Sequence, residues 1–135
     1  MEKKLSAKLR VRSYELDAYG HVNNATYLQY LEFARGEYMK QMGIAFRHDM
    51  DDKIRFFVVN ANLNFKAPAL IDEELELIGR VSKMGNSSFS IKQDIYNTAN
   101  NVHVLDAEVT IVFIDESNKP TRIPENYRKM LEEYN

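Results

Sequence analysis

The chain contains no cysteine, so disulfide bonds and a cysteine nucleophile are both excluded. No apolar run approaches the roughly 20 residues of a membrane-spanning helix. Neither sign of charge dominates, because 18 Lys and Arg face 20 Asp and Glu, a net charge of −2 that gives no reason to expect a nucleic-acid partner. The sequence also has no internal repeat and no low-complexity segment.

Several catalytic signatures are missing as well. There is no Gly-x-Ser-x-Gly elbow, no P-loop, no Gly-x-Gly-x-x-Gly and no His-Glu-x-x-His. The three histidines are scattered and have no metal-ligand spacing, so we expect no metal site. Common nucleotide, metalloprotease and serine-hydrolase chemistries therefore find no support.

What is present is the composition of an ordinary globular protein, with 44% hydrophobic and 28% charged residues. A length of 135 residues predicts a single domain over residues 1–135. The first ten residues are basic but lack the apolar stretch of a signal peptide. We therefore expect a cytoplasmic protein.

The first half of the chain predicts a short strand over residues 9–13 and then a long helix from about Asn24 to Met42. Asn23 or Asn24 is the expected N-cap, and Gly43 ends the helix. Apolar residues surround most of this helix, which predicts burial on several sides. Gly36 in its middle costs about 1 kcal/mol relative to Ala, so we expect a close backbone contact there.

The second half follows a period of two after a charge-rich loop over residues 47–55. Four strands are expected, over residues 56–66, 73–83, 88–96 and 102–114, and a short helix from Pro124 to Tyr134. The short connections between the strands predict antiparallel pairing. An antiparallel sheet with one apolar face and one long apolar helix predicts an α+β fold in which the sheet wraps around the helix.

The candidate chemistry lies where the long helix begins. Asp17 precedes the helix start by a short loop, and the free N–H groups of a helix start carry roughly +0.5 charge. A carboxylate facing such amides can activate water, or attack directly, at a carbonyl that the amides polarise. Most isolated loop aspartates, however, only form a turn or cap a helix, and the residues alone leave both readings open.

The same block resembles a family signature. Asp17-x-x-Gly20-His21-Val22-Asn23-Asn24-x-x-Tyr27-Leu28, followed by Glu32 and Ala34-Arg35, is similar to the motif of the hydroxybenzoyl-CoA thioesterase family of hotdog-fold acyl-CoA thioesterases. The resemblance continues at residues 64–68, 85–89 and 119–124, so it spans nearly the whole chain. It implies the hotdog fold, a five-stranded antiparallel sheet around a long central helix, with a short C-terminal helix.

The resemblance also implies roles for residues. Asp17 takes the position of the family's catalytic carboxylate, as nucleophile or as general base. The oxyanion would be held by the loop and helix start, formed by Gly20, His21, Asn24, Ala25 and Tyr27. Glu32 is a reserve catalytic candidate, although three-residue spacing also suits a salt bridge with Arg35. His21 is expected mainly to organise the loop.

The substrate implied by the resemblance is an acyl-CoA, with coenzyme A as part of the substrate and no separate cofactor. We expect the acyl chain to lie beside the helix, against Tyr27, Leu31 and Phe57. The CoA phosphates and pantetheine are expected to contact Arg80, Lys83, Asn86, Ser87 and Ser88. The strand over residues 56–66 has few charges and resembles an unprotected edge, which predicts a homodimer or homotetramer.

Two other functions remain open on this scaffold, since a fold does not fix a function. One is a non-catalytic module that binds acyl-CoA or an acyl carrier. The other is a hotdog-type dehydratase, which would require His21 and Asp17 to act as a pair on the substrate.

Overall fold

The structure is a computed structural model and describes residues 4–44 and 55–135, so most of the loop expected over residues 47–55 lies outside the described residues. Its elements are β1 (Leu5–Arg10), the 3₁₀ turn η1 (Ser13–Glu15), α1 (Asn24–Met42), β2 (Arg55–Phe65), β3 (Glu74–Met84), β4 (Ser88–Asn97), β5 (His103–Ile114) and α2 (Glu125–Glu132).

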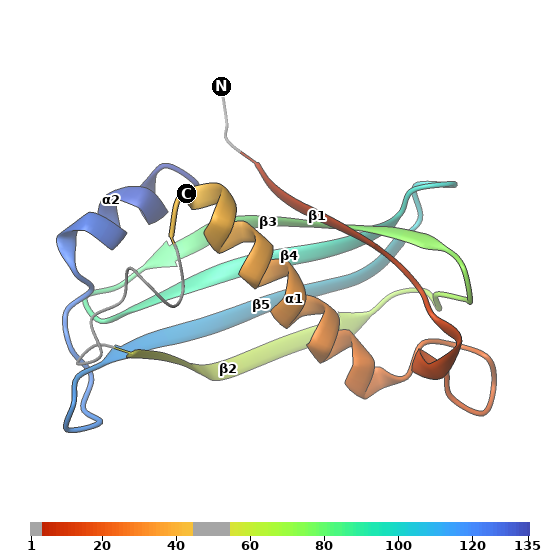
Figure 1. The fold of residues 1–135 in the computed structure, drawn as a ribbon, viewed down its shortest axis with the longest axis horizontal. Coiled ribbons are helices and arrows are strands. Elements are labelled where there is room, and N and C mark those ends of the chain that lie inside the picture. The colour runs from red at the N-terminus through yellow and green to blue at the C-terminus, as the bar shows by residue number, and fades with distance from the viewer. Residues whose placement is uncertain (1–3, 45–54) are drawn as a thin grey trace.

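The five strands form one antiparallel sheet in the order β1-β3-β4-β5-β2, and the sheet curves around α1 (Figure 1). This is the predicted α+β hotdog arrangement. The helix is not centred on the sheet, because it lies closer to β1 and β3 than to β2. As a result β2 is both an edge strand and the strand least covered by the helix.

The ends of α1 confirm the sequence prediction. Asn23 is the N-cap, and its side chain accepts a hydrogen bond from the N–H of Ala25. Gly43 ends the helix with φ +86°, a left-handed conformation that glycine adopts without steric cost. The expectation of burial on several sides is wrong for this chain. The buried residues cover about half of the circumference, whereas Phe33 on the opposite side is 44% exposed.

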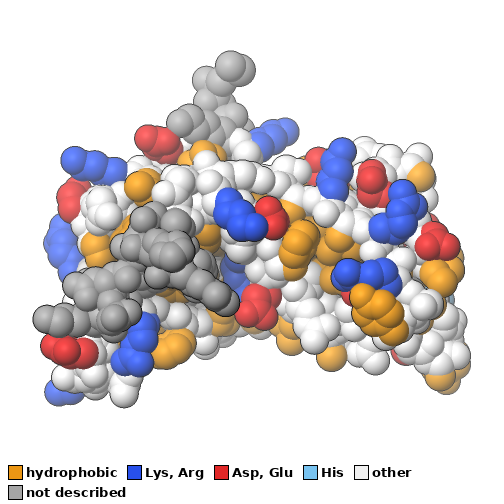
Figure 2. Space-filling model, in the orientation of Figure 1, with side chains coloured by type: hydrophobic (Ala, Val, Ile, Leu, Met, Phe, Trp, Pro, Cys, Tyr) orange, Lys and Arg blue, Asp and Glu red, His pale blue; other side chains and the backbone are white. Residues whose placement is uncertain are grey.

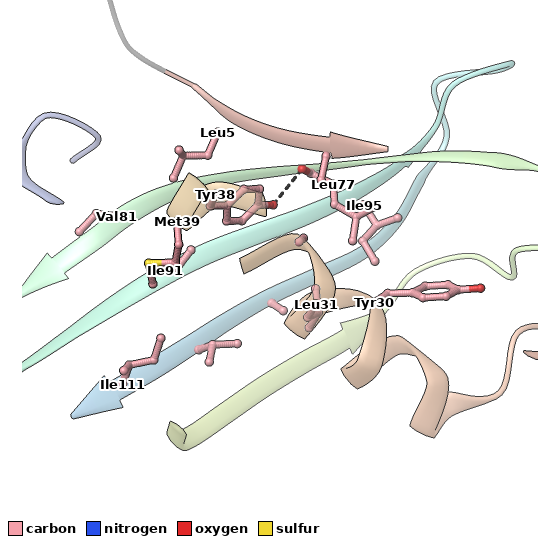
Figure 3. Close-up of a cluster of buried hydrophobic side chains, with 14 of the residues drawn as sticks. Leu5, Tyr30, Leu31, Tyr38, Met39, Leu77, Val81, Ile91, Ile95 and Ile111 are labelled. Atoms are coloured by element: carbon pink, nitrogen blue, oxygen red, sulfur yellow. Dashed lines mark hydrogen bonds between the residues drawn. The ribbon is translucent and has the colours of Figure 1, made fainter. Parts of the chain in front are cut away.

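The core lies between α1 and the sheet (Figure 3). Tyr38 is fully buried and donates a hydrogen bond of 2.8 Å from its hydroxyl to the Leu77 carbonyl. Its ring occupies the space above Gly79, where a Cβ would lie 2.7 Å from the Tyr38 Cζ. The close approach to a glycine therefore occurs at Gly79. The contact expected at Gly36 is absent, since a Cβ there would meet nothing within 4 Å among the described residues.

The first strand begins earlier than predicted. β1 runs from Leu5 to Arg10, and residues 13–15 form η1 instead of a strand end. The turn forms because the Glu15 carboxylate accepts the backbone N–H of Arg12, three residues before it. A local side-chain bond of this kind competes with strand pairing.

β2 contains an irregularity that the alternating pattern did not reveal. Its register against β5 shifts between Val58 and Asn60. Ala61, Leu63 and Phe65 pair with residues of β5 that are buried on the helix side, but beyond the bulge Val58 and Phe56 take over that side. All residues from 56 to 59 are apolar, so the sequence fits either phase.

Candidate active site

Asp17 closes the loop that connects η1 to α1. Its Oδ1 accepts the backbone N–H of Tyr19 at 2.9 Å and that of His21 at 3.2 Å. Its own N–H donates to the His21 carbonyl at 2.7 Å, and Gly20 adopts φ +82° to make the turn. Oδ2 accepts no hydrogen bond from the residues that the structure describes. Asp17 thus has the structural role of a loop aspartate and still presents one free carboxylate oxygen.

The first amides of α1 are not equally available. The N–H of Ala25 donates to the Asn23 side chain, and that of Thr26 to the Asn23 carbonyl at 2.9 Å. The N–H of Asn24 has no partner in residues 4–44 and 55–135. Asn24 is therefore the amide that a developing negative charge can use, and the helix dipole strengthens it.

Asp17 and Asn24 line the same pocket of about 270 Å³. The other lining residues come from the loop, from α1 and from the segment after β2; they are His21, Val22, Tyr27, Phe65, Lys66, Ala67 and Pro68. The buried Tyr27 ring packs 5.6 Å from the Phe65 ring, centroid to centroid, and burial raises the pKa of the Tyr27 hydroxyl. The lining residues supply one carboxylate, one cation and an apolar wall, and they include Asn24, whose backbone N–H is unpaired within residues 4–44 and 55–135.

A buried carboxylate anchors this loop from behind. Glu15 accepts a hydrogen bond from the Tyr30 hydroxyl and another from the Arg12 guanidinium, both at 2.8 Å, while its backbone carbonyl accepts the N–H of Asn23. Burial by itself raises the pKa of Glu15, but the hydrogen bonds from Arg12 and Tyr30 outweigh it and lower the pKa. Glu15 therefore connects both ends of the Asp17 loop to α1.

His21 contributes its backbone to the site. Its N–H and carbonyl both bond to Asp17, and it pairs with Leu70 in an isolated bridge. The imidazole is exposed and makes no hydrogen bond to Asp17. The side-chain pair that a dehydratase would need is not formed between His21 and Asp17 in this structure.

The three predicted acyl-pocket residues do not meet. Tyr27 lines the Asp17 pocket, Leu31 is completely buried in the core (Figure 3), and Phe57 lines a separate groove of about 500 Å³. This groove lies between α1 and the first half of β2. Of the loop and helix-start candidates, Gly20 and Ala25 are outside the Asp17 pocket and act through the turn and the cap.

Glu32 and Arg35 do not form the expected ion pair. Arg35 donates to Gln93 Oε1 at 3.1 Å, and the completely buried Gln93 side chain in turn donates to the Leu31 carbonyl. Burial lowers the pKa of Arg35, and the charge of Glu32 opposes that effect. Glu32 is exposed and lines the groove, not the Asp17 pocket.

The residues expected to contact CoA lie far from the Asp17 pocket within one subunit. Arg10, at the end of β1, pairs with Glu74, whereas the Asn86–Ser88 turn follows Met84, about 33 Å further along β3. Figure 1 shows this turn at the opposite end of the sheet from the Asp17 loop. Arg80 and Lys83 are both exposed, and Lys83 forms an ion pair of 3.5 Å with Glu108.

Two residues with clear roles were not among the predicted site residues. Lys66 is the cation of the Asp17 pocket, and the motif over residues 64–68 was the available signal for it. Arg128 of α2 donates to the Gly85 carbonyl at 2.7 Å and to the Asn86 carbonyl at 3.1 Å. No local sequence pattern predicts this contact between residues more than 40 positions apart.

Three larger features bear on which ligands and partners the protein could bind. Positive, negative and hydrophobic side chains are interspersed on the face seen in Figure 2, without a field of one sign. Neither helix of the structure is long and apolar enough to cross a membrane, within residues 4–44 and 55–135. The same residues contain no group of three His, Asp or Glu side chains that could hold a metal ion.

Comparison with known proteins adds independent evidence. Residues 11–131 match the family model described as the thioesterase-like superfamily. The long-chain acyl-CoA thioesterase FadM of Escherichia coli is 32% identical over 130 residues, which cover 96% of this chain and 98% of FadM. The acyl-CoA thioester hydrolase YbgC of Escherichia coli strain CFT073 is 30% identical over 87% of this chain and 88% of its own.

Solved structures agree. The probable thioesterase YbaW of Escherichia coli superposes with a TM-score of 0.79 at 30% identity, over 96% of this chain and 98% of that one. A 1,4-dihydroxy-2-naphthoyl-CoA thioesterase from Synechocystis gives a TM-score of 0.88 over 96% of each chain, but at 16% identity it supports the fold alone. The resemblance seen in the sequence is therefore confirmed: the chain belongs to the thioesterase-like superfamily.

Proposed function

We propose that this protein is a hydrolase of acyl-CoA thioesters, with Asp17 as the catalytic carboxylate. The observation that carries the proposal is that Asp17 lines one pocket with Asn24, whose backbone N–H is unpaired among the described residues, in a chain related to acyl-CoA thioesterases over almost its full length. The reaction needs only water as co-substrate. Coenzyme A enters as part of the substrate.

In the proposed reaction the thioester oxygen accepts the Asn24 N–H as negative charge develops on it. Such a preorganised donor is worth about 10²–10³ in rate. Asp17 either takes a proton from the attacking water or attacks the carbonyl carbon itself to form an acyl–Asp anhydride that water then hydrolyses. In both routes the carbon–sulfur bond breaks and CoA leaves as a thiolate, so no strong general acid is required.

The test is a thiol-release assay on a panel of short aliphatic, long aliphatic and aromatic acyl-CoAs. Asp17→Asn should lower kcat by about 10²–10⁴ because the amide is neither basic nor nucleophilic. If the Asp17→Asn variant stays fully active while Glu32→Gln is dead, the catalytic assignment moves to Glu32. A wild-type protein that binds acyl-CoA without releasing thiol would instead be a binding module.

The chain offers a matched control for this variant. Asp115 Oδ1 accepts the N–H groups of Ser117 and Lys119, and the Asp115 N–H donates to the Lys119 carbonyl. These are the same bonds that Asp17 makes within its own loop. Asp115→Asn should therefore match Asp17→Asn in stability and leave thiol release unchanged. Equal loss of activity in both variants would mean that the effect is structural.

We further propose that the active form is a homodimer that pairs the exposed edges of two β2 strands. The proposal is supported by the position of β2 at the sheet edge and by exposed Phe57, Val58 and Val59, which are 50%, 48% and 60% exposed. Light scattering at assay concentration tests the dimer and also shows whether two dimers join into a tetramer.

The proposed dimer would bring the predicted CoA-binding residues of one subunit close to the Asp17 pocket of the other. A two-fold pairing of β2 edges sets the start of one strand beside the end of the other. The Asn86–Ser88 turn, Arg80 and Lys83 of a second copy would then approach the end of the sheet that holds the Asp17 pocket, where Lys66 already lies. We propose that these cations contact the CoA phosphates. KM for acyl-CoA should rise with salt concentration. Variants that remove these charges should have a higher KM at low salt and a weaker dependence of KM on salt.

The cytoplasm is the compartment that we propose. The proposal follows from the proposed substrate class, because acyl-CoA thioesters occur there.

A further inference from the structure

Gly36 is a helix residue that packing does not explain. It lies in the middle of α1, where glycine destabilises the helix relative to alanine. A Cβ at this position would meet nothing within 4 Å among the described residues, so no close contact requires the missing side chain. Destabilising residues that survive without a structural reason are most often found where function needs them.

The open space beside Gly36 is the groove of about 500 Å³ between α1 and β2. A volume in this range is typical of small-molecule sites, which are mostly apolar with a few polar groups. Met39, Phe56, Val58 and Ile111 supply apolar walls, while Glu32 and Arg35 supply the polar groups. The groove exists because the helix is displaced from β2 and because Gly36 adds no side chain to fill the gap.

The groove and the Asp17 pocket lie along one line of the fold. Asn24, Leu28, Glu32 and Gly36 follow each other at intervals of four and form one ridge of α1, which winds about 120° around the helix axis between Asn24 and Gly36. Asn24 lines the pocket and Gly36 lines the groove, with the half-exposed Leu28 between them. On the facing strand, Leu63 and then Ala61 connect Phe65 of the pocket to Val58 of the groove. Ala61 is exposed and too small to block the path between the Asp17 pocket and the groove.

The distance from the Asp17 pocket to the groove indicates the length of acyl chain that would reach the groove. Gly36 is twelve residues beyond Asn24, about 18 Å at 1.5 Å per residue. An extended hydrocarbon chain built from C–C bonds of about 1.5 Å advances about 1.3 Å per carbon. A thioester carbonyl held at the Asn24 amide would therefore place about the fourteenth carbon of its acyl chain beside Gly36. Short acyl groups would end well before it.

We propose that the α1/β2 groove receives the distal part of a long, unbranched acyl chain, and that Gly36 determines the chain length. This inference rests on the proposed thioesterase function and names the substrate class of that site. A side chain at position 36 would occupy the space of the last methylenes. Shorter chains would not meet it.

The size of the effect follows from the number of carbons displaced. Removing one buried methylene costs about fourfold in binding. A leucine side chain has four carbons, so Gly36→Leu should lower kcat/KM for tetradecanoyl- and hexadecanoyl-CoA by up to about 200-fold. Hexanoyl- and octanoyl-CoA should change by less than about twofold. Gly36→Ala, with one carbon, should cost about fourfold on the long substrates alone.

The experiment measures kcat/KM against acyl length for the wild type, Gly36→Ala and Gly36→Leu. Lys40→Leu is the control, because it adds the same side chain at an exposed position of α1 outside the groove. A selective loss on long chains in the two Gly36 variants, absent from the control, supports the inference. An unchanged length profile overturns it. An equal loss on all lengths also overturns it, because that result shows a packing role.

A binding measurement separates this inference from the proposed activity. Calorimetric titration with S-hexadecyl-CoA and S-hexyl-CoA, two thioethers that cannot be hydrolysed, reports occupation of the groove without catalysis. If the hexadecyl compound binds the wild type more tightly than Gly36→Leu, the inference stands even when no thioester is hydrolysed. If both proteins bind it equally, the inference fails even when the thioesterase activity is real.

Discussion

Two glycines of this chain should respond in opposite directions to the same substitution. At Gly79 an added Cβ would lie 2.7 Å from the Tyr38 Cζ, within the core. At Gly36 it would meet no atom within 4 Å among residues 4–44 and 55–135. Gly79→Ala should therefore destabilise the protein, and Gly36→Ala should stabilise it.

The magnitudes follow from the contacts. Overpacking at Gly79 costs about 1–3 kcal/mol. Displacing the Tyr38 ring also strains its hydrogen bond to the Leu77 carbonyl, worth about 1 kcal/mol. The lower entropy of the unfolded chain returns about 0.4–1 kcal/mol. The net loss is about 1–3.5 kcal/mol. Gly36→Ala gains about 1 kcal/mol from helix propensity.

Thermal unfolding at one fixed protein concentration measures both changes. With an unfolding entropy of about 2.1 cal/mol/K per residue, 1 kcal/mol corresponds to about 3.5 °C for a chain of 135 residues. We expect Tm to fall by about 4–12 °C in Gly79→Ala and to rise by about 3 °C in Gly36→Ala.

A double-mutant cycle identifies the cause. Tyr38→Leu removes the ring atoms that the new Cβ would meet, so Gly79→Ala should cost less in that background. The reasoning is refuted if Gly79→Ala costs the same with and without the Tyr38 ring. A fall in Tm for Gly36→Ala would reveal a contact at Gly36 that residues 4–44 and 55–135 of a single subunit do not make.

Three further predictions follow from the site. Asn23→Ala removes the acceptor for the Ala25 N–H and should cost about 1 kcal/mol in urea unfolding, whereas Asn23→Asp should restore most of it. The lowered pKa of Glu15 means that its ionised form stabilises the fold above the ordinary glutamate value of about 4.3, and that this contribution disappears as the pH falls through the folded pKa. The stability difference between wild type and Glu15→Gln should accordingly shrink in acid, and a constant difference would contradict the assignment. Asn62→Pro removes one backbone donor from β2 and should lower both the mass seen by light scattering and the thiol-release rate; an active monomer would exclude the dimer.

Much of the fold could be predicted because its signals are local. The N-cap at Asn23, the stop at Gly43 and the two-residue period of β3 all depend on residues near each other in the chain. The predictions failed where residues distant in the sequence determine the local structure. The position of β1 depends on its register with β3, and the β2 bulge is invisible because either phase places apolar residues inside.

The site shows the same division. The sequence predicted a carboxylate ahead of a helix start, and the structure joins the two in one pocket. It could not predict that Arg35 would bond to Gln93 instead of Glu32, because the buried amide of Gln93 comes from a strand 58 residues away. Nor could it separate Gly36 from Gly79. One interrupts a helix and the other a strand, and only the tertiary arrangement shows which has a ring above it.

The two aspartate loops show why local pattern cannot decide the chemistry. Asp17 and Asp115 each accept the N–H groups two and four residues ahead, and each is followed three residues later by a positive φ, at Gly20 and at Asn118. Their local roles are therefore equivalent. Asp17 differs in its surroundings, since it lines a pocket together with Lys66 and with Asn24, whose backbone N–H has no partner among the described residues. A carboxylate becomes a candidate catalyst through the helix start that faces it, and that relation is a property of the fold and not of the turn.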